Sequence, residues 1–399
     1  MHAIRWSTLA FATLFAAATT PGYAQVATTF HGEVRPRYEF RNPLGGGPDQ
    51  FTSMRVRLGL EAMLDANLSV FAQLQDVRIW GEETHPLFDY RADNLDLHQG
   101  YLRHRGERLE WLTVTAGRME ATFGEERLVG PVGWAQQGQS FDGVRLDVDQ
   151  AWGDVAIISY RLGDETATSV AVDKEFYGAY GTVPDLGPGD IDLYWLYDRT
   201  EGAAETDQHS VGARYVFAAP GDIEGRVEGT FQTGTRAGND VSAYLLGARV
   251  GKAFLERRVG VTLWYDYVSG DDASTAETEA FHTLFATNHK FYGLADLFLD
   301  LPVHTAGAGL QDMALKLSWQ PRDDFSLAAD LHSFRAAERG TLSGSHFGDE
   351  IDLTASHRYS EHLTAVTGFS YVLQDDPLAE IGRLSEDLKW LYVMLSAAF

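Results

Sequence analysis

The chain has 399 residues, and its charges are unbalanced, with 32 lysines and arginines against 57 aspartates and glutamates. The formal net charge of −25 leaves no basic surplus to neutralise phosphates, so nucleic acid is excluded as a partner. There is no cysteine, and 40 glycines with only six methionines favour many short strands joined by turns over helices.

Residues 1–24 predict a secretory signal peptide. An apolar run from Leu9 to Ala18 follows a weakly basic start, and Gly22-Tyr23-Ala24 provides the small residues of a cleavage site. The run is too short to span a bilayer, which disfavours the alternative of a membrane anchor. No later segment is long and apolar enough for a transmembrane helix. If residues 25–399 lie in a membrane, they must therefore cross it as a β-barrel, whose closed hydrogen-bond ladder needs no disulfide.

The rest of the chain alternates between polar and apolar residues in short segments. In 29–40 and again in 51–62, charged or small polar residues occupy every second position. This period of two predicts strands with one face toward lipid and the other toward a lumen. Eighteen strands are predicted, at 29–40, 51–62, 68–78, 95–105, 111–118, 141–148, 153–162, 175–183, 191–198, 209–217, 223–232, 241–253, 259–268, 310–319, 325–335, 350–358, 363–373 and 387–399.

This pattern predicts an all-β fold, a transmembrane antiparallel β-barrel of about 18 strands. An even number of strands places both ends of the chain on one side, and short turns alternate with longer loops as expected for periplasmic and extracellular ends. The alternative is a soluble protein with many strands. A barrel of this kind has the lipid bilayer and lipopolysaccharide as its surroundings.

The last predicted strand, 387–399, ends on Phe399. Stepping back by two from Phe399 gives an uncharged face, while Trp390 and Tyr392 lie on the other face. A terminal aromatic residue in an alternating strand resembles the end of bacterial outer-membrane β-barrels, where this strand closes against the first. The resemblance implies the barrel-assembly machinery as a partner that binds this strand.

Arginines recur on the polar face of the predicted strands. Arginine facing lipid costs about 2–4 kcal/mol at mid-bilayer, so these side chains are expected to line the lumen. Guanidinium groups there favour anions, and carboxylates in particular. In the alternative interpretation, acids such as Glu33, Glu61, Asp142, Asp147, Glu228, Asp266 and Asp352 neutralise them in salt bridges that only stiffen the wall. The predicted pore-lining residues are Arg35, Arg37, Arg55, Arg57, Arg118, Arg145, Arg214, Arg226 and Arg249.

The longest predicted connection, 269–309, is the candidate constriction or lid. Its second half is too aromatic for a disordered segment, and loops of this length are usually functional or disordered. We expect it to fold inward or over the mouth of the barrel; the alternative is a surface loop packed on its neighbours. Candidate constriction residues are Asn288, His289, Lys290 and Tyr292.

Several stretches resemble the alginate export family of outer-membrane proteins, in order and over nearly the whole mature length. They are 117–147 (GRMEATFGEERLVGPVGWAQQGQSFDGVRLD), EFYGAY, IDLYWLYDR, WYDYVSGDD and TNHKFYGLADLF. The resemblance implies a monomeric eighteen-stranded barrel through which an anionic polysaccharide, or a related acidic solute, crosses the outer membrane. It also implies lumen arginines as the selectivity element, carried over to Arg118 and Arg145. The turns at 320–324 and 359–362 are shorter than in alginate exporters, which carry a large periplasmic turn.

Other functions have less support in the sequence. An enzyme in the barrel wall, such as an outer-membrane phospholipase or protease, is one alternative. No serine motif accompanies His282, His289 and His304, so we expect no catalytic residues and no enzyme activity. The histidines show no metal-binding spacing, and we expect neither a metal nor a cofactor. A diffusion porin for small anions or oligosaccharides is the nearest alternative, and a purely structural barrel or an adhesin is a more distant one.

Overall fold

The computed structural model describes residues 26–42, 49–82, 95–165, 172–202 and 205–399. The predicted signal peptide at 1–24 lies outside these residues. Within them, no helix combines the length and the apolar character that a membrane crossing requires.

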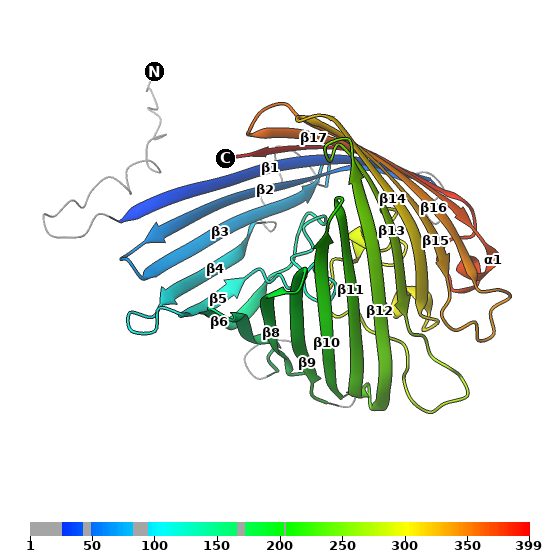
Figure 1. Cartoon of the computed structure of the whole chain (residues 1–399), viewed down its shortest axis with the longest axis horizontal. Coiled ribbons are helices and arrows are strands. Elements are labelled where there is room, and N and C mark those ends of the chain that lie inside the picture. The colour runs from blue at the N-terminus through cyan, green and yellow to red at the C-terminus, as the bar shows by residue number, and fades with distance from the viewer. Residues whose placement is uncertain (1–25, 43–48, 83–94, 166–171, 203–204) are drawn as a thin grey trace, which may run out of the picture.

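The chain forms one closed antiparallel sheet of eighteen strands, as predicted (Figure 1). Strand β1 pairs with β2 on one side and with β18 on the other, which closes the barrel. The predicted strand ends agree with the observed ones to within four residues. The strands are β1 (Ala27–Asn42), β2 (Asp49–Met63), β3 (Leu68–Ile79), β4 (Leu95–Arg105), β5 (Leu112–Met119), β6 (Phe141–Gln150), β7 (Gly153–Gly163), β8 (Lys174–Leu186), β9 (Gly189–Thr200), β10 (Thr206–Ala219), β11 (Ile223–Arg236), β12 (Asn239–Phe254), β13 (Val259–Val268), β14 (Leu310–Arg322), β15 (Phe325–Arg335), β16 (His346–Arg358), β17 (Leu363–Gln374) and β18 (Leu388–Ala398).

The two ends of the barrel differ in the length of their connections. The end that holds both chain termini has short turns, whereas the other end carries the long connections at 120–140 and 269–309. This asymmetry assigns the termini to the periplasm. The predicted alternation is wrong at one place, because β11 and β12 are joined at the long-loop end by Ala237 and Gly238 alone. Both residues have positive φ, 51° and 81°, as a two-residue hairpin turn requires.

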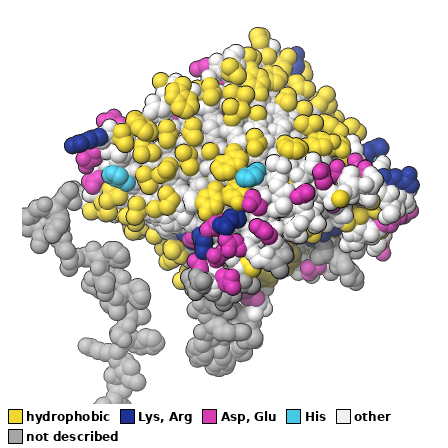
Figure 2. All heavy atoms as spheres, turned by 90° about the horizontal axis from the view of Figure 1, so that it is seen from below, with side chains coloured by type: hydrophobic (Ala, Val, Ile, Leu, Met, Phe, Trp, Pro, Cys, Tyr) yellow, Lys and Arg dark blue, Asp and Glu magenta, His cyan; other side chains and the backbone are white. Residues whose placement is uncertain are grey.

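The outer and inner faces of the wall differ in polarity as predicted. In β18, Leu391, Val393 and Leu395 are exposed, whereas Trp390 and Tyr392 are buried in the interior. Figure 2 shows broad hydrophobic areas on one view of the molecule, with charged side chains gathered toward the edges. This is the surface of a barrel that meets hydrocarbon across its middle. Recognition of Phe399 by the barrel-assembly machinery stays a prediction.

Two connections fold into the ring of strands and fill much of it. Loop 120–140 and loop 269–309 meet at Val129 and Phe285, which form an isolated β-bridge. Loop 269–309 contains the short helices η1 (Asn288–Lys290) and η2 (Val303–Thr305), and its yellow segments lie inside the barrel in Figure 1. Its aromatic side chains, among them Phe281 and Phe298, belong to one buried cluster with inward-facing wall residues. The helix α1 (Asp376–Glu380) lies in the β17–β18 connection.

Candidate functional site

Arginines of β1 hold loop 120–140 against the wall. The Arg35 guanidinium donates to Oε1 of Gln136 at 3.1 Å and to the carbonyl of Gly133 at 2.8 Å. Arg37 donates to the carbonyl of Trp134 at 2.7 Å, and its Nε donates to Glu39. The loop turns its carbonyl oxygens toward β1, and the bonds to Gly133 and Trp134 satisfy backbone acceptors with charged donors.

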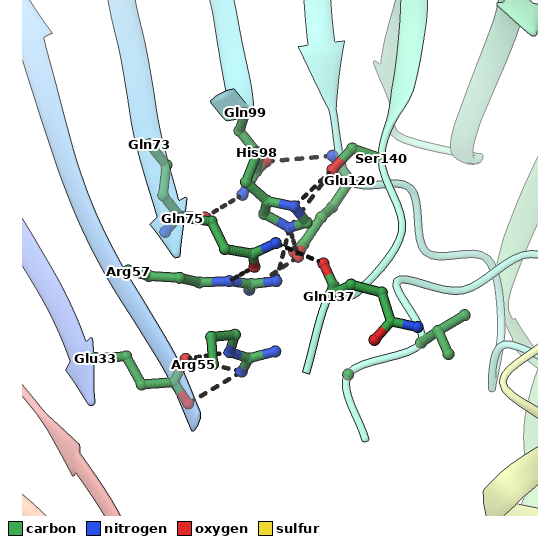
Figure 3. Close-up of polar contacts among 12 residues, drawn as sticks. Glu33, Arg55, Arg57, Gln73, Gln75, His98, Gln99, Glu120, Gln137 and Ser140 are labelled. Carbon is green, nitrogen blue, oxygen red and sulfur yellow. Dashed lines mark hydrogen bonds and ion pairs between the residues drawn. The ribbon is translucent and has the colours of Figure 1, made fainter. Parts of the chain in front are cut away.

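Strand β2 continues this arginine wall (Figure 3). Arg55 lies against Glu33, with Nη2 at 2.8 Å and 3.0 Å from the two carboxylate oxygens. Arg57 donates to Glu120 at 3.1 Å, and the ring of His98 lies 2.7 Å from the same carboxylate oxygen. Burial alone would raise the pKa of Glu120, but His98 and Arg57 outweigh it and hold this pKa below its usual value.

Arg41, which the sequence analysis did not include, extends the wall toward the extracellular end. It lies 3.3 Å from Glu39 and 3.6 Å from Asp296 of loop 269–309, and its guanidinium lies over the ring of Trp390. The predicted first strand stopped at residue 40, but the same alternation that selected Arg35 and Arg37 reaches Arg41. A cavity of about 610 Å³ separates this part of the wall from the two loops.

A second arginine group lies across the lumen on β10, β11 and β12. Arg214 and Arg226 contact the carboxylate of Glu125 at 3.0 Å and 2.7 Å, and Arg249 makes a short contact with the same group. Burial alone would raise the pKa of Glu125, but the charges of the three arginines outweigh it and leave this pKa below its usual value. The structure thus brings together three of the predicted arginines around one carboxylate of loop 120–140.

Arg127, from the same loop, lies deeper and was also missed by the sequence analysis. Its guanidinium is buried, 2.6 Å from Asp266 of β13 and 3.3 Å from Glu228 of β11. It also donates to the hydroxyl of Tyr292 at 3.2 Å and lies 4.1 Å above the ring of Phe291. No periodicity marks an inward-pointing residue in an irregular loop, so strand patterning gives no signal for Arg127.

Charges in this second group balance. The members are Arg127, Arg214, Arg226 and Arg249 with Glu125, Asp192, Glu228 and Asp266, four cations against four anions. Salt bridges join five of the seven acids expected to neutralise arginines: Glu33, Asp142, Asp147, Glu228 and Asp266. Four of these acids lie in the lumen and Asp142 pairs with Arg118 on the outer face, so the alternative of a salt-bridged wall describes part of the lumen.

The two arginines taken from the matched motif point in opposite directions. Arg145 faces the lumen, where it bonds Asp147 at 2.7 Å and lies over the ring of Phe123 beside a cavity of about 200 Å³. Arg118 points outward, so its expected place in the lumen is wrong. The next residue, Met119, packs in the interior, and strand alternation then turns Arg118 to the outer face.

The candidate constriction residues lie inside the barrel, contrary to the alternative of a surface loop. Asn288 donates to the carbonyl of Leu299 at 3.0 Å, and Tyr292 accepts from Arg127. Lys290 pairs with Glu126 at 3.1 Å and keeps an exposed side chain. The His289 ring stacks on Trp134, and its Nδ1 lies 2.5 Å from Asp296.

Comparisons with known proteins agree with the barrel fold. The alginate export family model matches residues 26–374. No curated protein matches the sequence. Among solved structures from Pseudomonas aeruginosa, OccD3 (OpdP) superposes with a TM-score of 0.64 at 12% identity, covering 94% of this chain and 91% of that one. OccK8 (OprE) gives 0.65 at 10% identity with 93% and 98% covered, and the outer membrane protein OprD gives 0.62 at 13% with 93% of each chain.

Proposed function

The chain belongs to the alginate export family and forms an outer-membrane β-barrel channel, and from this premise we propose that it passes acidic solutes along its lumen arginines. The solutes are carboxylate-bearing saccharides, either an alginate-like polysaccharide or shorter oligosaccharides and small anions. The proposed selectivity residues are Arg35, Arg37, Arg41, Arg55, Arg57, Arg145, Arg214, Arg226 and Arg249. Compared with the residues predicted from the sequence, this set includes Arg41 and leaves out Arg118.

The observation that carries this proposal is the convergence of Arg214, Arg226 and Arg249 on Glu125. These arginines already bind a carboxylate, and they lie on neighbouring strands that fix their spacing. The side chains of Arg249 and Arg214 are 27% and 12% exposed, so a dissolved carboxylate has access to these two guanidinium groups, whereas Arg226 lies buried behind them. Arginine binds carboxylates through paired hydrogen bonds, which distinguishes uronates from neutral sugars.

The inward loops favour the shorter solutes. The cavities on the two sides of the loops measure about 610 Å³ and about 200 Å³. Ligand sites for small molecules span about 300–1,000 Å³, a range that includes the larger cavity and lies above the smaller one. A long polymer needs a continuous wide path, and loops 120–140 and 269–309 occupy that path through contacts with both walls. Diffusion of acidic oligosaccharides thus requires less rearrangement than polymer export.

Reconstitution in planar bilayers tests this function. We expect anions to be preferred over cations, and current to be blocked by oligomers of uronic acid at concentrations where neutral oligosaccharides of equal length have no effect. Replacing Arg214 and Arg249 by glutamine should weaken both properties. Arg257 and Arg258, exposed and ion-paired at the periplasmic turn after β12, provide the matched control pair. Cation preference in the unaltered channel contradicts the proposal.

Glu125→Gln provides the complementary test. Removing this charge takes away the one carboxylate that Arg214, Arg226 and Arg249 share and leaves the group with one excess positive charge, so the variant should show stronger anion preference and block at lower uronate concentration than the unaltered channel. A barrel in which the arginines serve only to stiffen the wall would instead lose stability without any gain in block.

A further inference from the structure

A row of alternating charge crosses the outer face of six neighbouring strands. Its members face one another directly in the strand register from β5 to β10. We name this row the rim ladder; it consists of Arg118, Asp142, Arg161, Glu175, Arg199 and Asp207.

Burial on the two faces of these strands shows that the rim ladder points outward. The sequence neighbours of three ladder residues, Met119, Phe141 and Tyr160, are buried in the interior. On the ladder's own face, Val144 and Ile157 are exposed. The guanidinium-bearing side chains of Arg118, Arg161 and Arg199 are 33%, 41% and 42% exposed.

The acids of the rim ladder hold its arginines in place. Arg118 lies 2.7 Å from Asp142, and Arg199 lies 2.9 Å from Glu175, which also makes a short contact with Arg161. Within the row, three cations alternate with three anions, and beside the row Asp164 and Asp173 pair with Arg161 and Glu201 pairs with Arg199. Each arginine therefore stands fixed on the outer surface, and successive arginines lie two strands apart, about 10 Å at the usual strand spacing.

The rim ladder lies where the membrane's polar layer begins. It occupies the strand ends that lead into the long-loop, extracellular side of the barrel. One rung toward the periplasm on the same face, Tyr177 and Tyr197 stack with ring centroids 6.0 Å apart. A further rung down, Ile157 and Trp195 are exposed. From the extracellular side inward, the outer face therefore presents a charged row, then an aromatic row, then apolar residues. This order of layers is expected at the edge of the hydrocarbon.

We propose that the rim ladder binds the phosphorylated headgroups of glycolipids in the extracellular leaflet. Guanidinium groups pair with phosphate oxygens in two parallel hydrogen bonds, and the ladder presents one at every second strand. Headgroup phosphates are accompanied by divalent cations, for which the intervening carboxylates provide oxygen ligands. A row of alternating charge is thus complementary to a headgroup layer that itself alternates between phosphate and cation, whereas a purely basic patch would match the phosphates alone.

Native mass spectrometry and thermal unfolding of the purified barrel test the proposal. The probes are lipid A with both phosphates, the same lipid without phosphates, and phosphatidylglycerol. We expect phosphorylated lipid A to remain bound and to raise the unfolding temperature, and R118Q/R161Q/R199Q to bind it at least about tenfold more weakly, since charged hydrogen bonds are lost. The control is R257Q/R258Q/R322Q, which removes three exposed, ion-paired arginines at the periplasmic end and should bind as the unaltered protein does.

Several results would overturn this assignment. One is equal binding of lipid A with and without phosphates, and another is tighter binding of phosphatidylglycerol. A third is equal loss of affinity in the ladder and control variants. Retained binding in the ladder variant that disappears on chelation of divalent cations would assign the interaction to the carboxylates and remove the arginines from it. Because every variant lies outside the lumen, ion selectivity serves as an independent check that the barrel is intact.

Discussion

Trp134 and His289 stack with their ring centroids 4.2 Å apart and their planes 6° apart. The guanidinium of Arg37 lies 4.1 Å from the same indole ring. Trp134 therefore joins three elements, namely β1, loop 120–140 and loop 269–309. The two inward loops are held as one unit, and movement of either loop relative to the other requires the Trp134–His289 stack to break.

Trp134→Ala should loosen that unit. Loss of the stack and of the cation–π contact is expected to lower the stability of the docked loops by about 2–3 kcal/mol. The barrel wall keeps its hydrogen bonds, so the variant should insert normally but show larger, noisier currents and faster proteolysis within 120–140. The control is Trp152→Ala, at an exposed position in the turn after β6. Equal behaviour of the two variants would refute the joint role of Trp134.

Arg127→Met tests the buried ion cluster. The change removes the nearest cation from buried Asp266 and Glu228 and leaves only Arg226, 3.8 Å and 3.9 Å away, so we expect a cost of up to about 3–5 kcal/mol. We expect faster hydrogen exchange throughout loop 120–140. Combining it with Asp266→Asn removes one of the stranded charges and should recover part of the protection. If the single variant exchanges as slowly as the unaltered protein, Arg127 does not hold the loop.

The sequence predicted the wall well and the lumen only in part. Alternation in each strand is a local signal, and it placed Arg35, Arg55 and Arg226 on the inner face. In the structure these three side chains are buried on that face. Arg35 and Arg226 find their partners, Gln136 and Glu125, 101 residues away in an irregular loop, which no period identifies. The convergence of three strands on Glu125 depends on how loop 120–140 folds inward, and that path is set by packing among aromatic side chains from distant segments.

Arg118 illustrates a different limit. Both the polar-face pattern and the motif resemblance assigned it to the lumen, whereas the structure buries the next residue, Met119, and turns Arg118 outward. An outward arginine is tolerated there because it lies one residue from the end of β5 and pairs with Asp142, close to the polar layer where the cost falls to about 0–1 kcal/mol.

Gly293→Ala should detach loop 269–309 from β16. Gly293 has φ of 82°, and a Cβ there would lie 2.5 Å from the carboxylate of Glu350. That carboxylate accepts the N–H of Ala295 at 2.7 Å, so displacing it breaks a buried hydrogen bond. The expected result is faster hydrogen exchange around 293–296 and an altered conductance. Gly340→Ala is the matched control, because Gly340 also has positive φ but an open surrounding. If Gly293→Ala and Gly340→Ala had equal effects, the positive φ of the backbone alone, and not the contact with Glu350, would explain the change.

The docking of loop 269–309 should weaken as the pH falls from about 6.5 to about 4. Burial and the charge of Arg236 lower the pKa of His282 from 6.5 to about 4, so the docked loop holds this ring neutral. The undocked loop takes up a proton at the ordinary pKa. Stability from the neutral ring is therefore complete above pH 6.5 and lost toward pH 4, by at most about 3 kcal/mol.

Hydrogen exchange of residues 269–309 measured between pH 7 and pH 4 checks this dependence, after correction for the intrinsic effect of pH on exchange. His282→Gln should flatten most of it. His304 in the same loop has a pKa lowered by burial and by Arg383, so the double variant His282→Gln with His304→Gln should remove the remainder. His209→Gln, on the outer face of β10, is the control and should leave the profile unchanged. An unaltered profile in the double variant would mean that other groups set the pH response.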